Sequence, residues 1–288
     1  MAIAHASEST FRDHIRPLVR GLCGGFLFSV PIIYTMEMWW LGYGTDLAKI
    51  GALLLFSFAL SVGLNMVSGF REGEDLVECM TDAVEALALG IIVAATMLYL
   101  LGEIDAGAAW PIVARQVVVL AIPISIGVSM ARSLLGEQGG DDAEAASPPD
   151  EPASGGLRED AKDLALTAFG GVFLGLSVAP TEEILVIATH SQLPQTLGTV
   201  ALALALSYLT LFEARFVGQT QRLRSEGMFQ DPWQETVLTY AVSLVISTGL
   251  LWFLGFLNAP MAWDEILSMI VVLALPVSMG GAAARLIL

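Results

Sequence analysis

The feature that most constrains this chain is a series of apolar runs, each long enough to cross a lipid bilayer. A hydrocarbon core of ~30 Å is crossed by roughly 20 consecutive apolar residues in a helix. Short polar breaks separate the runs, so we expect each run to be a span of its own. We place eight spans at about 18–41, 47–69, 79–102, 110–134, 164–188, 196–217, 235–257 and 264–287.

These spans are expected to be helices. Backbone groups inside a bilayer must satisfy their own hydrogen bonds, and a helix does so within one segment. A membrane barrel needs segments of ~10 residues with alternating hydrophobicity, and the sequence lacks them. With 55% hydrophobic and 15% charged residues, the chain is too apolar for an ordinary soluble domain. The sequence therefore predicts an all-α polytopic membrane protein of eight transmembrane helices.

The second half of the chain resembles the first. A shift of 153 residues aligns 82–135 with 235–288 without a gap, and 18 of the 54 positions are identical. The identities include Trp110/Trp263 and Arg132/Arg285, which a shared apolar composition does not explain. Earlier in each half the shift is 146 residues, and it pairs Glu37 with Glu183. We interpret the pattern as an internal duplication.

Four spans per half is an even number, so both halves enter the membrane from the same side. We therefore expect two parallel repeats, 1–135 and 163–288, related by a pseudo-twofold axis along the membrane normal. Between them, 136–162 is acidic and rich in Pro, Gly, Ser and Ala. That composition is typical of a disordered linker.

Lysine and arginine near the ends of the spans predict the orientation. Of the 13 in the chain, only Lys49 and Arg115 fall on the side opposite to the termini. Because basic residues collect in cytoplasmic loops, we expect both termini and the linker in the cytoplasm. The predicted location is a bacterial inner (plasma) membrane, with the lipid bilayer as the immediate partner.

Carboxylates within the spans are the first candidate functional residues, because an ionisable group at the centre of a span costs about 2.5–3.5 kcal/mol on insertion scales. Glu37 and Glu183 are equivalent under the repeat. Pro31 and Pro180 are expected to loosen the helices and to let oxygen atoms of Thr35, Thr181 and Glu182 converge with these glutamates. Such oxygen clusters suit hard cations or a proton relay. The alternative is that the glutamates lie at the interface and only accept hydrogen bonds from neighbours.

A second acidic cluster lies at the cytoplasmic end of the spans. Glu74, Glu78, Asp82 and Glu85 fall within about 80° of one helical face, and Asp231 and Glu235 repeat part of the pattern. An acidic mouth concentrates cations. Acids in the first turn of a helix also stabilise its dipole, which is the structural alternative. For Arg132 and Arg285, at the cytoplasmic ends of their helices, we expect snorkelling and dipole pairing.

At Pro31–Gly42 (PIIYTMEMWWLG), together with Ala179–Glu183 (APTEE), the chain resembles a family of bacterial integral membrane proteins of unknown function. The resemblance extends over nearly the whole chain outside the linker. It implies an integral membrane protein and assigns no activity to particular residues.

Three functional interpretations remain open from the sequence. The first is a cation or proton channel or secondary transporter that uses the repeated carboxylates. The second is a membrane-embedded sensor or scaffold that binds other membrane proteins through the linker and loops. A membrane enzyme is the least favoured, because no catalytic motif is present and none of the three histidines, His5, His14 and His190, lies deep in a span. No cofactor, metal or nucleic-acid partner is expected, whereas a homo-oligomer is compatible with the sequence.

Overall fold

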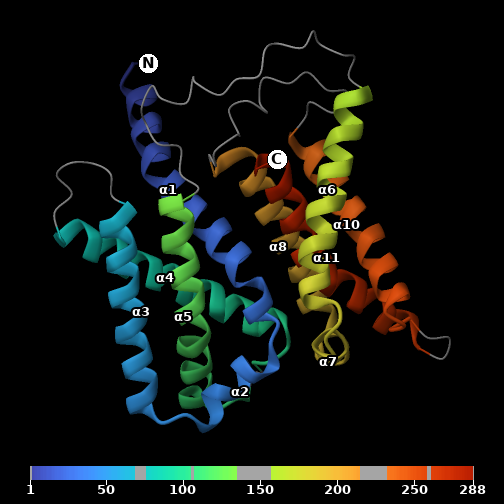
Figure 1. The fold of residues 1–288 in the computed structure, drawn as a ribbon, viewed down its shortest axis with the longest axis horizontal. Helices are drawn as coiled ribbons and strands as arrows, with labels where there is room; N and C mark the ends of the chain where they lie inside the picture. Colours follow the sequence, from blue (N-terminus) through green and yellow to red (C-terminus); the bar gives the residue numbers. More distant parts are fainter. Residues whose placement is uncertain are drawn as a thin grey trace.

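The computed structural model describes residues 2–68, 76–104, 107–134, 157–214, 232–257 and 261–287. Within these ranges every regular element is a helix, which confirms the all-helical class. Figure 1 shows the first turn of α1 and the last turn of α11 at one end of the molecule, with α2 and α7 at the opposite end.

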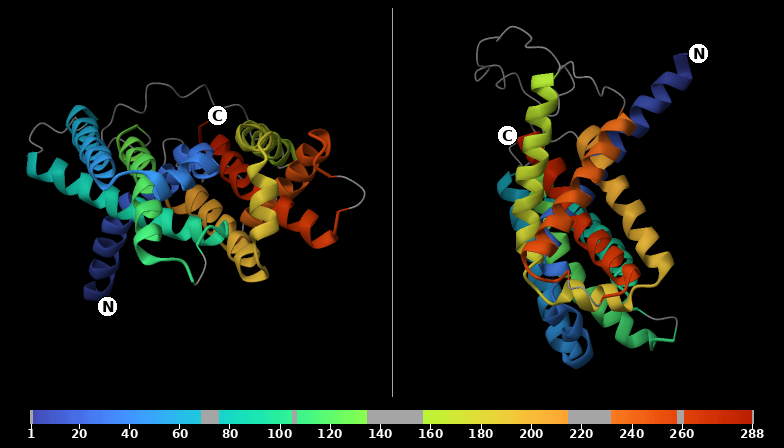
Figure 2. Two further views of the ribbon diagram at one scale, coloured as in Figure 1. Left: turned by 90° about the horizontal axis from the view of Figure 1, so that it is seen from below. Right: turned by 90° about the vertical axis from the view of Figure 1, so that its right-hand side faces the viewer.

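The elements follow one another in two sets. The first set is α1 (Ala2–Ile33), α2 (Met36–Gly44), α3 (Leu47–Ser68), α4 (Leu76–Leu100) and α5 (Trp110–Leu134). The second set is α6 (Leu157–Val178), α7 (Glu183–His190), α8 (Leu193–Tyr208), the π-helical turn η2 (Leu209–Glu213), α10 (Pro232–Phe253) and α11 (Trp263–Ile287). The first set occupies one side of the molecule and the second set the other (Figures 1 and 2). We call them the first and second halves.

Several helix bounds agree with the sequence offsets. α5 and α11 begin and end at positions 153 residues apart, and α3 and α8 begin at positions 146 residues apart. α4 and α10 are both followed by a glycine with a φ of +79°, Gly102 and Gly255. At each glycine the next residue donates its backbone N–H to a carbonyl five residues earlier, a Schellman ending that requires the left-handed conformation.

Seven helices of the described residues are long and apolar enough to cross a membrane. An eighth candidate consists of α6 and α7, which meet at a bend of 87°. The predicted span at 164–188 is therefore a broken span or a re-entrant segment. The region predicted as a span at 18–41 is divided at the equivalent position of the first half. There α1 ends at Ile33, and Thr35 is extended, with φ −95° and ψ 117°.

A proline lies close to each break. Pro180 lies inside the second break, and Pro31 lies one turn before the first. Proline has no N–H to donate, and its ring disfavours the helical conformation at the preceding residue. Pro180 therefore accounts for the end of α6 at Val178, whereas α1 continues through Pro31 to Ile33.

A central helix organises each half. In the first half α1, α2, α3 and α4 pack around α5, and in the second half α6, α7, α8 and α10 pack around α11. The α6–α11 contact is so close that a Cβ atom at Gly170 would lie 2.1 Å from the carbonyl oxygen of Gly280. Glycine at these positions lets the two backbones touch, as small residues do between membrane helices.

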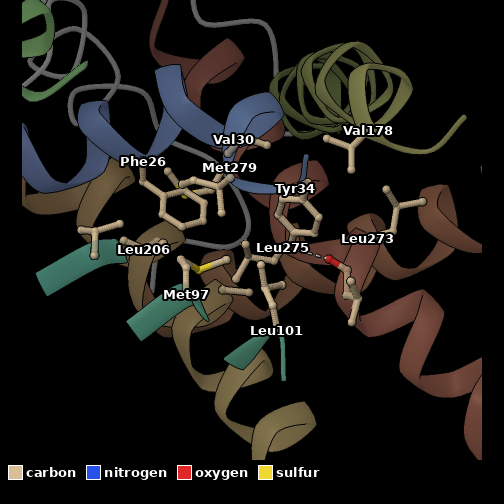
Figure 3. Close-up of a cluster of buried hydrophobic side chains, with 14 of the residues drawn as sticks. Phe26, Val30, Tyr34, Met97, Leu101, Val178, Leu206, Leu273, Leu275 and Met279 are labelled. Carbon is tan, nitrogen blue, oxygen red and sulfur yellow. Dashed lines mark hydrogen bonds between the residues drawn. The ribbon is translucent and has the colours of Figure 1, made fainter. Parts of the chain in front are cut away.

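A buried apolar cluster joins the two halves. Figure 3 shows Phe26 and Val30 of α1, and Tyr34 just after it, facing Leu275 and Met279 of α11, with Leu206 of α8 beside them. The hydroxyl of Tyr34 donates a hydrogen bond of 2.9 Å to the carbonyl oxygen of Val272. The two halves therefore share one core.

Candidate functional site

Arg285, in the last turn of α11, is a buried charged residue. Its side chain is 4% exposed and forms ion pairs with Asp163 of α6 and Glu235 of α10. Its Nη1 donates a further hydrogen bond of 3.1 Å to the hydroxyl of Thr239. A guanidinium stays charged at any physiological pH and presents five donors in a fixed plane. Arg285 thus ties together the α6, α10 and α11 ends that Figure 1 shows on the side of the termini.

The first half has the corresponding arrangement around Arg132 of α5. Its Nη2 lies 3.0 Å from Oε2 of Glu85, and its Nη1 lies 3.7 Å from Oδ1 of Asp82. Both carboxylates are on α4 and are about half exposed. This network joins two helices and is more open to solvent than the network around Arg285.

These contacts bear on two expectations from the sequence. Arg132 and Arg285 do not simply extend their side chains toward the interface, because both are largely buried and bound to carboxylates. Asp82, Glu85 and Glu235, which were predicted to line the inner end of an ion path, are the partners that neutralise these arginines.

The sequence contained a signal for this pairing. Asp82 precedes Arg132 by 50 residues, and Glu235 precedes Arg285 by the same 50 residues. A repeated acid–base spacing of this kind indicates paired residues on neighbouring helices. Asp163 gave no such signal, because Pro17 occupies the position 146 residues earlier.

Glu74, Glu78 and Asp231 are the remaining acids of the inner cluster. Glu78 is exposed in the first turn of α4, where it favours the helix dipole. Glu74 and Asp231 lie outside the described residues.

At the opposite end, the two threonines do not join their neighbouring glutamates. The hydroxyl of Thr35 donates to the carbonyl oxygen of Pro31 at 2.6 Å, and that of Thr181 donates to the carbonyl oxygen of Val178 at 2.7 Å. Each hydroxyl therefore bonds a carbonyl of the helix turn that precedes the break. The expected convergence of hydroxyl and carboxylate oxygens is not seen in the described hydrogen bonds.

The three outer glutamates differ in their surroundings. Glu37 in the first turn of α2 and Glu182 just before α7 are exposed. Glu183, the first residue of α7, is 8% exposed. Among the described residues its side chain has no hydrogen-bond or ion-pair partner. Enclosing most of an acidic side chain within a membrane protein is costly, so Glu183 is the strongest candidate for a functional acid.

Glu183 stands where the chain turns by 87° and where α7 packs against α11. A break of this kind interrupts the hydrogen-bonding pattern of a helix, and membrane proteins tolerate it where protein or water surrounds the backbone. Broken helices carry the ion and substrate sites of many secondary transporters. A buried acid and a helix break therefore coincide at one place.

Comparison with known proteins identifies the family. A family model described as "Putative integral membrane protein (DUF2391)" matches residues 17–288. The chain belongs to this family. The match confirms the resemblance carried by Pro31–Gly42 and Ala179–Glu183, and it identifies an integral membrane protein. No curated protein and no solved structure shows a significant match.

Proposed function

We propose that this protein moves a cation or a proton across the membrane, as a channel or as a secondary transporter. The observation that carries the proposal is the buried residue Glu183 at the break between α6 and α7, whose carboxylate forms no hydrogen bond or ion pair with the described residues. A carboxylate at such a break can bind a cation or relay a proton, and a bound cation compensates its charge.

The architecture that we propose for this function is eight spans in two parallel halves, with the α6–α7 pair as the fifth span. The matching bounds of α5 and α11, the breaks at equivalent positions and the central helix of each half support it. Both termini face the cytoplasm of a bacterial inner membrane in this proposal, because the basic residues gather at that end.

The inner acids have a different part in this proposal from the one that the sequence predicted. Asp82 and Glu235 are held by arginines, so their charges are already compensated. A cation gains little from a carboxylate whose charge an arginine already neutralises. The pathway hypothesis therefore depends on Glu183, and the arginine networks close the inner ends of the helix bundles.

A flux assay tests the proposal directly. Purified protein in liposomes is challenged with a panel of monovalent and divalent cations at two pH values, with a pH-sensitive dye to report protons. Replacement of Glu183 with Gln removes one charge and nearly keeps the shape of the side chain. We expect flux to fall at least about tenfold, the effect of about 1.4 kcal/mol on a rate or a binding constant.

The matched control is Glu182→Gln, the same substitution at the exposed neighbouring position. We expect it to leave flux unchanged, because solvent already surrounds that carboxylate. Wild-type flux in Glu183→Gln, or correctly folded protein that passes none of the tested cations, contradicts the proposal. The second result favours the sensor or scaffold interpretation.

A further inference from the structure

The contact between the two halves is one-sided. The first half contributes mainly α1 and α4, whereas the second half contributes mainly α8, η2 and α11. Two hydrogen bonds of 2.9 Å cross this contact. Arg20 Nε donates one to the carbonyl oxygen of Ala214, and Gln195 Nε2 donates the other to the carbonyl oxygen of Tyr99. Two halves that met through equivalent faces would form each contact twice. Instead, each half presents a different face to the other.

The second half has an exposed face that is equivalent to the α1 face buried between the halves. A shift of 146 residues carries the α1 contact residues onto α6, and there Cys23 corresponds to Phe169. Cys23 is 1% exposed, whereas Phe169 is 63% exposed. The equivalents of Phe26 and Val30 are Val172 and Leu176, which are exposed as well. We call Phe169, Val172, Phe173 and Leu176 the α6 face.

The complementary open face lies on the first half. The same shift carries the α8 contact residues onto α3, where Leu206 corresponds to Leu60 and Gly198 to Ala52. Leu206 is buried in the shared core, and a Cβ atom at Gly198 would lie 2.6 Å from Leu100. Leu60 and Ala52 are both exposed. We call Ala52, Leu53, Phe56 and Leu60 the α3 face.

Exposed apolar residues alone do not indicate a partner in a membrane protein, since lipid tails are equally apolar. The fold already packs α1 against η2, which continues α8 in the same span, and it packs α8 against α4. One further copy of the α1 face and one of the α8 face remain unused. Faces that differ from each other, both carried by parallel units, associate head to tail and close into a ring when the rotation permits it.

We propose that a second copy of this chain docks on these surfaces, with the α6 face of one subunit on the α3 face of the next. The proposal rests on the two-half architecture proposed above and not on the movement of a cation. The hydrogen bonds of the internal contact are not carried over, because Leu166 replaces Arg20 and Pro180 replaces Tyr34. The contact between subunits is therefore apolar packing, and we expect it to be weaker than the internal one.

Cysteine cross-linking in native membranes tests the orientation. The two native cysteines, Cys23 and Cys79, are buried thiols, and both are first replaced by Ala. Into this background we introduce Val172→Cys on the α6 face and Leu60→Cys on the α3 face, singly and together. Neither single variant is expected to cross-link. Co-expression of the two single variants is expected to give a dimer, and the double variant a ladder of multiples of the chain mass.

Two controls calibrate the experiment. Phe26→Cys combined with Leu206→Cys reports the internal contact. The disulfide between these cysteines is expected to keep the two halves joined after the chain is cleaved at a protease site introduced at 154. Ile92→Cys paired with Val172→Cys is the negative control. Ile92 is exposed, and its equivalent Val245 is exposed outside the internal contact, so no cross-link is expected.

Native mass spectrometry of the unsubstituted protein gives a second measurement that does not depend on the variants. We expect masses of two or more chains at low detergent. A single-chain mass together with no inter-chain cross-link overturns the docking proposal. A cross-link formed by Val172→Cys alone also overturns it, because it shows equivalent faces in contact. A monomer that still carries cations refutes only this proposal and leaves the proposed function intact.

Discussion

Removal of the charge at Arg285 is expected to destabilise the protein more than the same change at Arg132. Arg285 is 4% exposed, and its partner Glu235 is 14% exposed. With Gln at position 285, Glu235 loses its counter-charge in a largely desolvated place. Loss of one partner of a buried ion pair costs about 3–5 kcal/mol. The unfolding equilibrium constant is then expected to rise by roughly two to three and a half orders of magnitude, at about 1.4 kcal/mol for each tenfold change.

Arg132→Gln is the matched control for this prediction. Arg132 is also at the end of a central helix, but Asp82 and Glu85 are about half exposed. Solvent continues to stabilise these carboxylates after the arginine is lost. Exposed pairs contribute about 0–1 kcal/mol each, so we expect a change of at most about 2 kcal/mol for the two together.

The assay is reversible unfolding in mixed micelles, with helix content followed as the fraction of SDS is raised. The free energies of unfolding of Arg285→Gln and Arg132→Gln are compared with that of the wild type. The double variant Arg285→Gln with Glu235→Gln removes the stranded charge as well, and we expect it to recover part of the loss. Equal losses for the two arginine variants would refute the reasoning from burial, as would a further loss in the double variant.

Three other predictions follow from the packing and the topology. Gly170→Ala places a Cβ atom 2.1 Å from a carbonyl oxygen of α11 and should cost about 1–3 kcal/mol of unfolding free energy. Gly249→Ala, with nothing within 4 Å, should cost nothing in the same micelle assay, so equal losses would refute the backbone contact. Tyr34→Phe removes the hydrogen bond between the halves and should lower stability by about 0.5–1.5 kcal/mol in the same assay, whereas an unchanged value would mean that the bond contributes nothing. A cysteine at Gln192 should react with an impermeant reagent in intact cells and one at Ser154 only after permeabilisation, and external labelling at 154 would overturn the topology.

The features of this protein that the sequence predicted correctly are those that depend on interactions between residues close together in the chain. The length of the apolar runs is set by the thickness of the bilayer, so the helical class and most spans followed from the residues alone. Pro180 marked the break between α6 and α7 for a similarly local reason, because its ring disfavours the helical conformation at the preceding residue. The spacing shared by α5 and α11 was also readable from the sequence offset.

Tertiary structure decided what depends on neighbours that are distant in sequence. The buried state of Glu183 and the exposed state of Glu37 result from different packing at positions with the same local pattern. The pairing of Arg285 with Asp163 and Glu235 depends on how three helix ends meet.

The one-sided contact between the halves is the clearest case. Two similar sequences place Cys23 in a shared core and Phe169 on the surface, because each half presents a different face to the other. An apolar residue is equally stable against lipid and against another helix, so hydropathy specifies the span but not the partner. The choice between these surroundings is made by close packing, which only the assembled helices determine.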